Sequence, residues 1–181
     1  MKAKCTRYHY MKEVGRFLKT KNYKNDNVLE ISGHTQEWLR YFKSKTIAKF
    51  PEVDAHKLPY KNASFDAVIC NQVLEHVRKP WVCVEEFRRV LVDGGILIIS
   101  SPFIYQEHNY PVDNWRFTPS GLEVLCEDFS EVLILHRGGN SKMIEHMIKH
   151  PTDRRSDEFY TFLDVEEEKL YYTTSTIVVK K

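Results

Sequence analysis

The sequence predicts an α/β domain with a mostly parallel, twisted sheet and helices on both faces of that sheet. Short apolar runs alternate with amphipathic segments along the chain, an order typical of strands joined by helices that cover them. The length of 181 residues suits one domain with a proper core. No internal repeat or low-complexity tract divides the chain, so we expect a single domain over residues 1–181.

Six short apolar runs are the expected strands. They are Asn27–Ser32, Lys45–Lys49, Ala67–Asn71, Gly95–Ser100, Val132–His136 and Thr176–Lys180. The last run is rich in β-branched residues, which favour extended backbone. We expect it to be an antiparallel strand that closes one side of the sheet.

Four amphipathic segments are the expected helices. They are Tyr10–Thr20, Thr35–Phe42, Pro80–Leu91 and Pro119–Glu127. In the third segment, Val84, Phe87 and Leu91 form one apolar stripe at helical spacing. Asp93–Gly95 should stop this helix and turn the chain into the next strand, because glycine readily adopts a positive φ. Residues 140–169 show less pattern, and we expect one or two charged helices there.

The charge balance gives no reason to expect a nucleic acid or an anionic membrane as partner. The chain carries 27 basic and 25 acidic residues, a formal net charge of +2. The longest apolar runs, such as Ile96–Ile99, are far too short to cross a bilayer. The first residues mix charged with apolar side chains instead of forming a leader peptide. We therefore expect a cytoplasmic protein without membrane insertion, and the sequence does not predict its oligomeric state.

No metal site is expected from the cysteines or the histidine pair. The cysteines have no C-x-x-C spacing and lie mostly among apolar residues, which favours buried free thiols: Cys5, Cys70, Cys83 and Cys126. His146 and His150 are four residues apart on an expected helix, a spacing that metal ligands use. No glutamate follows His146 and no third ligand is evident, so we interpret the pair as part of a solvated helix face.

Four stretches of the sequence carry a resemblance to a known family. The most specific is DAHKLPYKNASFDAVICNQVLEHV; VLEISG precedes it, and EEFRRVLVDGGILIISSP and HNYPVDNWRFTPSGLEVL follow it. Together they resemble class I S-adenosylmethionine-dependent methyltransferases of the small-molecule, type 11-like branch. The fourth stretch is similar to a feature of members that modify sugars and polysaccharides. The resemblance implies a Rossmann-like methyltransferase fold and S-adenosylmethionine as cofactor.

The resemblance also implies the residues that bind this cofactor. Glu30 would brace the first loop, and that loop would face the methionine part of the cofactor. Asp54 corresponds to the acid that accepts from the adenine amino group, with Ala55 and His56 beside the ring, although a turn acid is the alternative for Asp54. Asn71 and Gln72 would border the methionine moiety and the sulfonium. The full set is Glu30, Ser32, Gly33, His34, Asp54, Ala55, His56, Asn71 and Gln72. Residues 32–34, 54–56 and 71–72 fall at or just after the ends of expected strands, and ligands of doubly wound sheets bind beyond the carboxyl ends of the strands.

The sequence departs from the family pattern in two places. The first loop has Ser32, His34 and Gln36 where the family has glycine, so a Cβ atom occupies room that the ligand needs. Lys49 stands near the acid that normally accepts from both ribose hydroxyls, and lysine only donates. Glu52 is a candidate substitute. The chain also runs directly from this strand to PEVDAHKLPY, so we expect the usual intervening helix to be missing.

Candidate catalytic residues lie in HNYPVDNWRFT, after the strand expected at Gly95–Ser100. His108 is suited to take a proton near neutral pH, Asp113 to orient it, and Arg116 to clamp a hydroxylated or anionic acceptor. The alternative is that Asp113 and Arg116 only tie down a loop, with Thr118 capping the next helix. His76 is more easily explained as a partner of nearby backbone than as a catalyst.

Two functions of different kinds remain open from the sequence. The first is a methyltransferase that uses S-adenosylmethionine to methylate a hydroxyl of a saccharide or another small-molecule acceptor. The second is a catalytically inactive, methyltransferase-like binding or assembly protein, which Lys49 and the glycine-poor loop favour. A nicotinamide dehydrogenase is a distant third, because the first loop lacks G-x-G-x-x-G.

Overall fold

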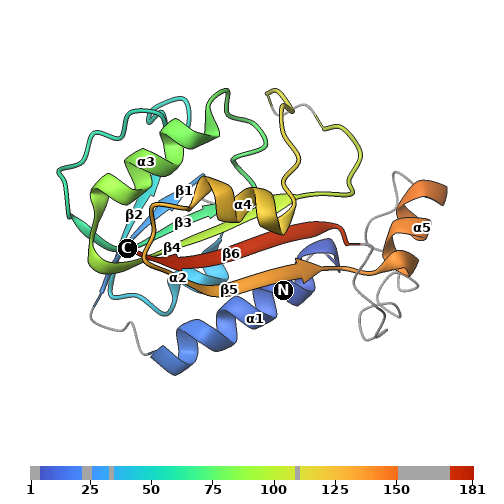
Figure 1. The fold of residues 1–181 in the computed structure, drawn as a ribbon, viewed down its shortest axis with the longest axis horizontal. Coiled ribbons are helices and arrows are strands. Elements are labelled where there is room, and N and C mark those ends of the chain that lie inside the picture. Colours follow the sequence, from blue (N-terminus) through green and yellow to red (C-terminus); the bar gives the residue numbers. More distant parts are fainter. Residues whose placement is uncertain (1–4, 22–25, 33–34, 109–110, 151–171) are drawn as a thin grey trace.

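The computed structural model describes residues 5–21, 26–32, 35–108, 111–150 and 172–181, and Figure 1 shows their arrangement. Six strands form one sheet in the order β2-β1-β3-β4-β6-β5. The elements are α1 (Cys5–Lys21), β1 (Asn27–Ile31), α2 (Gln36–Leu39), β2 (Ser44–Ala48), β3 (Phe65–Asn71), α3 (Pro80–Val90), β4 (Leu91–Pro102), α4 (Pro119–Leu125), β5 (Glu131–Gly138), α5 (Ser141–Lys149) and β6 (Thr174–Lys180). The predicted α/β class with a mostly parallel sheet is confirmed.

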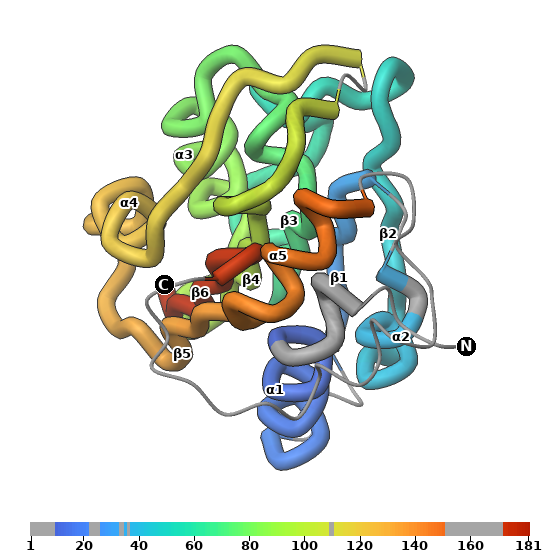
Figure 2. The backbone as a smooth tube through the Cα atoms, turned by 90° about the vertical axis from the view of Figure 1, so that its right-hand side faces the viewer, coloured from blue at the N-terminus to red at the C-terminus, as the bar shows by residue number. Residues whose placement is uncertain are grey.

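Side chains alternate between the two faces of the sheet with the period of two that strands impose. On β3, Val68 and Cys70 belong to one apolar cluster, while Ala67 and Ile69 belong to the other. Helices α3 and α4 cover the first face, and α1 and α2 cover the second. Figure 2 shows these two pairs of helices on opposite sides of the sheet. The core therefore has two layers, and helices lie on both faces as predicted.

The carboxyl ends of the parallel strands lie at one edge of the sheet. Ile31 at the end of β1 pairs with Ala48 of β2, and the residue opposite it on β3 is Cys70. At the end of β3, Asn71 lies opposite Ser100 of β4. The loops that follow β1, β2, β3 and β4 consequently begin side by side, and the candidate site is built from them.

The C-terminal strand is antiparallel but does not close the sheet. β6 pairs with β4 on one side and with β5 on the other, so β5 is the outer strand. The prediction that the last strand forms an edge is wrong. Because a connection within the sheet need not join neighbouring strands, a strand's place in the chain order does not fix its place in the sheet order.

The segment between β2 and β3 contains no helix, as the sequence predicted. Two residues of α3 fasten this segment instead. Glu86 accepts a hydrogen bond from the Leu58 amide at 2.8 Å, and the Arg89 guanidinium donates to the Tyr60 and Leu58 carbonyl oxygens at 2.8 and 3.0 Å. Arg89 also donates to the side chain of Asn62 at 2.8 Å. β2 is left as the other outer strand, with Ile47 exposed.

Several local predictions can be compared with the structure. Gly94 has the positive φ expected of it, +81°, but the prediction that Asp93–Gly95 stop the helix is wrong, because α3 ends at Val90 and these residues already belong to β4, which begins at Leu91. Cys70, Cys83 and Cys126 are buried free thiols, whereas the side chain of Cys5 lies outside the described residues. No helix among the described residues combines the length and the apolar character needed to span a bilayer.

The helix α5 corrects one prediction about the histidine pair. His146 is buried, so it does not belong to a solvated helix face, whereas His150 is exposed just beyond the end of the helix. The two imidazole rings lie 4.8 Å apart. Sequence spacing alone does not tell which side of a charged helix faces the rest of the chain.

Candidate functional site

The first loop keeps a backbone conformation that favours glycine although it carries serine. Ser32 has a φ of +100°, and its amide donates to the Ala48 carbonyl at 2.9 Å. Glu30 is fully buried, and its carboxylate accepts a hydrogen bond from the Thr35 amide. This is the bracing contact that the resemblance implied for Glu30. Gly33 and His34 lie outside the described residues.

Asp54 is tied to its neighbour in a tight turn. Its Oδ1 accepts from the His56 amide at 2.9 Å and lies 2.7 Å from Nδ1 of the His56 ring. Nε2 of the same ring accepts from the Lys79 amide, so the proton of a neutral imidazole lies on Nδ1. The amide of His56 is the main cause that lowers the pKa of Asp54. The side chain is 57% exposed, so the carboxylate remains accessible to a ligand.

Asn71 lies at the centre of a buried polar network below the loops. Its side-chain oxygen accepts from the Tyr10 hydroxyl at 3.0 Å and from the Ser100 hydroxyl, and its amide nitrogen donates to the Thr35 hydroxyl at 3.1 Å. The next residue, Gln72, has a φ of +58° and donates to Ser100. This network holds the ends of β3 and β4 against α1 and the start of α2.

The described turn after β2, which the resemblance places on the ribose side, exposes its charged residues. Lys49 and Glu52 are both exposed in the turn after β2. Ala55, which the resemblance places beside the adenine ring, is buried in the core cluster. Asp54, the acid that the resemblance matches to adenine, thus presents an accessible carboxylate, and Lys49 directly follows the end of β2.

A buried ion pair shapes the loop between β4 and α4. The side chain of Asp113 is 1% exposed, and the guanidinium of Arg116 binds both of its carboxylate oxygens. Arg116 also donates to the carbonyl oxygens of Trp115 and Gln106, and the pair is the main cause that lowers the pKa of Asp113. Thr118 caps α4 by accepting from the Gly121 amide, as predicted. The contacts by which Asp113 and Arg116 would tie down this loop are therefore present.

His108 lies beside this ion pair, partly exposed. Its amide donates to Oδ2 of Asp113 at 2.8 Å, and its Nδ1 lies 3.1 Å from the same oxygen. Burial is the main cause that lowers the pKa of His108, and the Asp113 carboxylate opposes that effect. The ring meets His76 and Tyr105 edge to face, with centroids 5.0 and 5.3 Å apart.

The loop after β3 is fastened to the loop that carries His108. The Glu75 carbonyl accepts from the Asn114 amide at 2.7 Å, and the Val77 carbonyl accepts from the Trp115 indole at 2.9 Å. Nδ1 of His76 lies 2.6 Å from the Val112 carbonyl, which confirms the interpretation of His76 as a partner of backbone. The sequence analysis did not name Glu75 as a candidate site residue. The pattern that indicates it is an acid among apolar residues just after a strand.

The fold and site together define a class I, Rossmann-like methyltransferase domain. The family described as "Methyltransferase domain" matches residues 9–99, half of the chain, and the chain belongs to that family. The cofactor of this class of enzyme is S-adenosylmethionine. No curated protein matches the chain in sequence.

Solved structures with low sequence identity share the fold. An S-adenosylmethionine-dependent methyltransferase from Mesorhizobium loti is 12% identical, with a TM-score of 0.61 over 92% of this chain and 96% of that chain. The YcgJ protein from Bacillus subtilis is 16% identical, with a TM-score of 0.57 over 95% and 97% of the two chains. The [4+2]-cyclase SpnF is 17% identical, with a TM-score of 0.59 over 93% of this chain and 80% of that chain.

The residues at the carboxyl edge fit this cofactor on two sides. The left-handed backbone at Ser32 and the braced carboxylate of Glu30 fit the loop that faces the methionine part. The accessible carboxylate of Asp54 fits the adenine amino group. On the ribose side, Glu52 is the carboxylate that remains near the end of β2, in an exposed turn.

Proposed function

We propose that the protein transfers a methyl group from S-adenosylmethionine to a hydroxyl of a saccharide or another small-molecule acceptor. The observation that carries the proposal is the position of His108. It lies in the loop after β4, at the sheet edge where the loops with the cofactor-binding candidates also begin. When bound, the cofactor supplies an electrophilic methyl group on a sulfonium.

In this proposal His108 takes the proton of the acceptor hydroxyl at Nε2. Nδ1 lies 3.1 Å from Oδ2 of Asp113 without the alignment of a hydrogen bond, and in this proposal a small rotation of the ring lets Nδ1 donate to that carboxylate and leaves the lone pair on Nε2. Because burial lowers the pKa of His108, the ring is neutral and able to accept a proton at neutral pH. Arg116 acts through Asp113 as a positioning residue, since its terminal nitrogens already bind that carboxylate and two backbone carbonyls.

Specific observations favour the second candidate function, a methyltransferase-like binding protein without turnover. Lys49 stands where the family has its ribose acid, and Ser32 brings a side chain to a backbone that favours glycine. The SpnF cyclase, a structural neighbour, is a [4+2]-cyclase, so a fold of this kind does not by itself establish methyl transfer.

Binding of S-adenosylhomocysteine, measured by calorimetry, tests the first half of the proposal. Asp54→Asn keeps an oxygen for the His56 turn but presents an amide donor where the adenine amino group needs an acceptor. We expect binding by the wild type and a loss of about 5- to 150-fold in the variant, the equivalent of about 1–3 kcal/mol. Asp93→Asn is the matched control, because Asp93 is 99% exposed near the start of β4. A folded wild type that binds no cofactor product would refute the proposal.

Transfer of a labelled methyl group to a panel of saccharides tests the second half. His108→Ala should lower turnover by about 10²–10⁴-fold and leave the affinity for S-adenosylhomocysteine unchanged. The wild-type rate should rise with pH through a midpoint below the ordinary pKa of histidine. Full turnover of His108→Ala on an acceptor that the wild type methylates would contradict the assignment of the base.

A further inference from the structure

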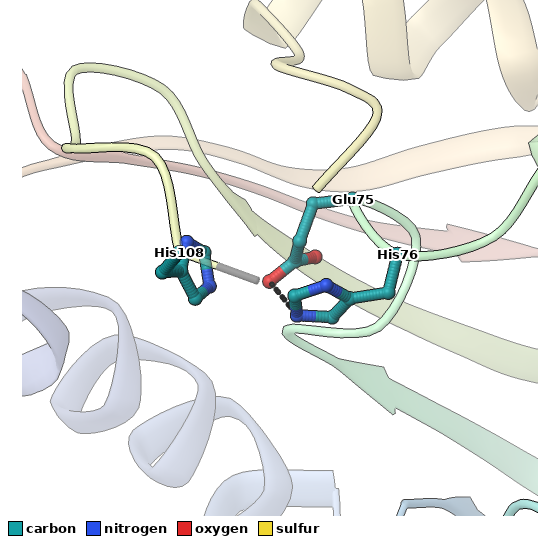
Figure 3. Close-up of side chains that lie close together, drawn as sticks. All are labelled: Glu75, His76 and His108. Atoms are coloured by element: carbon teal, nitrogen blue, oxygen red, sulfur yellow. Dashed lines mark ion pairs between the residues drawn. The ribbon is translucent and has the colours of Figure 1, made fainter. Parts of the chain in front are cut away.

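Three side chains from two loops meet at the carboxyl edge of the sheet. Glu75 and His76 follow β3, and His108 follows β4. Each offers one ligand atom, and these atoms all lie within 4.8 Å of one another. Figure 3 shows the rings of His76 and His108 on either side of the Glu75 carboxylate. From this arrangement we infer that Glu75, His76 and His108 form a binding site for one divalent transition-metal ion such as zinc.

The hydrogen bond of His76 directs its free nitrogen toward the carboxylate. Nδ1 lies 2.6 Å from the Val112 carbonyl, which only accepts, so Nδ1 carries a proton. The lone pair of the neutral ring is then on Nε2, 3.7 Å from Oε1 of Glu75. This separation is too long for a hydrogen bond. A lone pair and a carboxylate oxygen that face each other are suited to bind a common cation.

A carboxylate lies near the other ring nitrogen of His108. Nδ1 lies 3.1 Å from Oδ2 of Asp113 but makes no hydrogen bond, so a small rotation of the ring is needed for Nδ1 to donate there and for Nε2 to be left for a metal. Histidines that bind metals usually donate their other ring N–H to a carboxylate or a backbone carbonyl, which fixes the tautomer and the ring orientation. His76 has the carbonyl and His108 has the carboxylate. The outer hydrogen bond of His76 is thus formed, and the carboxylate that could serve His108 lies within 3.1 Å of its Nδ1.

The distances and charges suit a small cation. Ligand atoms at about 2.0–2.2 Å from a tetrahedral zinc lie roughly 3.4 Å apart, so modest rotations of these side chains would close the site. The positive charge of Arg116 is engaged mainly by Asp113, and Glu75, which also accepts from the Ser101 hydroxyl at 3.3 Å, places a further negative charge beside the two rings. Two imidazoles with one carboxylate favour zinc or another transition metal over magnesium.

The exposure of the three side chains gives the metal a route from solvent. The exposed fraction rises from 0% at Glu75 through 16% at His76 to 29% at His108. Three protein ligands also leave a coordination position open for water or an acceptor oxygen. A metal there would occupy the Nε2 lone pair that the proposed function uses as the base, and would itself lower the pKa of a bound hydroxyl. The metal site differs from the sequence-based expectation of no metal and does not depend on methyl transfer.

Binding of the metal alone tests the site. The chain is purified without a histidine tag, stripped with a chelator and titrated with Zn²⁺ by calorimetry, with Mg²⁺ in a parallel titration. We expect one equivalent of Zn²⁺ bound and Mg²⁺ bound at least tenfold more weakly. Glu75→Gln, His76→Ala and His108→Ala should each weaken Zn²⁺ binding by tenfold or more. His150→Ala is the matched histidine control outside the site and should bind as the wild type does.

Two further variants separate a metal site from a fold defect. His76→Gln can still donate to the Val112 carbonyl through its amide, so the loop is kept while the imidazole ligand is lost. Asp113→Asn should lower Zn²⁺ affinity by about 10–100-fold, the usual effect of removing the partner of a metal-bound histidine. Thermal melts of each metal-free variant report folding separately. The proposal is overturned if the wild type binds no Zn²⁺, if His76→Gln and His108→Ala bind as tightly as the wild type, or if His150→Ala removes binding. Because none of these titrations involves the cofactor, their outcome is independent of the test of methyl transfer.

Discussion

Replacing Ser32 with glycine should stabilise the protein. Ser32 has a φ of +100°, a region that residues other than glycine enter at a cost of about 1–3 kcal/mol. Glycine removes that cost, but it lowers the free energy of unfolding by about 0.5–1 kcal/mol, because a glycine gives the unfolded chain more conformational freedom. Ser32→Gly should therefore raise the free energy of unfolding by about 1 kcal/mol. For a chain of this size that corresponds to a rise of about 2–4 °C in Tm.

Urea denaturation of three variants measures the effect and isolates its cause. Ser32→Ala keeps the Cβ atom and removes only the hydroxyl, whose oxygen is buried without a hydrogen-bond partner among the described residues. Ser32→Ala should raise the free energy of unfolding only by the amount that comes from removing the buried hydroxyl, because the strained backbone is kept. Ser120→Gly is the matched serine-to-glycine control, because Ser120 is exposed in α4, and it should lose about 0.5–1 kcal/mol. The reasoning is refuted if Ser32→Gly destabilises the protein as much as Ser120→Gly does.

Two further predictions concern the ion pairs that hold the loops. The folded-state pKa of Asp113 lies well below its unfolded value, so its contribution to stability is present above about pH 4 and is lost as the pH falls below it. Chemical denaturation between pH 2.5 and pH 6 should show a smaller acid-induced loss for Asp113→Asn than for the wild type, and equal losses would contradict the assignment. Arg89→Ala should lower the free energy of unfolding by about 2 kcal/mol, because its guanidinium holds three backbone and side-chain oxygens of residues 58–62. If the urea denaturation curves of Arg89→Ala and of the exposed Arg88→Ala coincide, Arg89 does not stabilise the segment of residues 58–62.

The strands and helices could be predicted from the sequence because each is bounded by a local signal. The β-branched and aliphatic runs gave all six strands to within four residues at each end, and Pro80 and Pro119 fixed the starts of two helices. The order of strands could not be predicted, since β6 reaches its place between β4 and β5 only through long-range pairing. Local patterns report on neighbours along the chain, and sheet order is a property of the whole core.

The site was predictable as far as single stretches could indicate it. The stretch HNYPVDNWRFT contains His108, Asp113 and Arg116. The alternative that Asp113 and Arg116 tie down the loop agrees with the ion pair in the structure. The proximity of His76 and His108 could not be read from the sequence, because they are 32 residues apart and meet only when β3 and β4 lie side by side. The hydrogen bond that ties Asp54 to His56 was likewise visible only in three dimensions.

The place of β6 in the sheet has a consequence for biosynthesis. Among the described strands, β5 pairs with β6 alone, and β6 occupies the position between it and β4. While the ribosome is still translating the residues before 174, the parallel strands can associate, but β5 has no partner and one side of β4 stays open. Such unpaired edges expose the nascent chain to misassociation. Folding of the sheet therefore finishes only after residues 174–180 emerge from the exit tunnel, and chaperone binding is expected to persist until that moment.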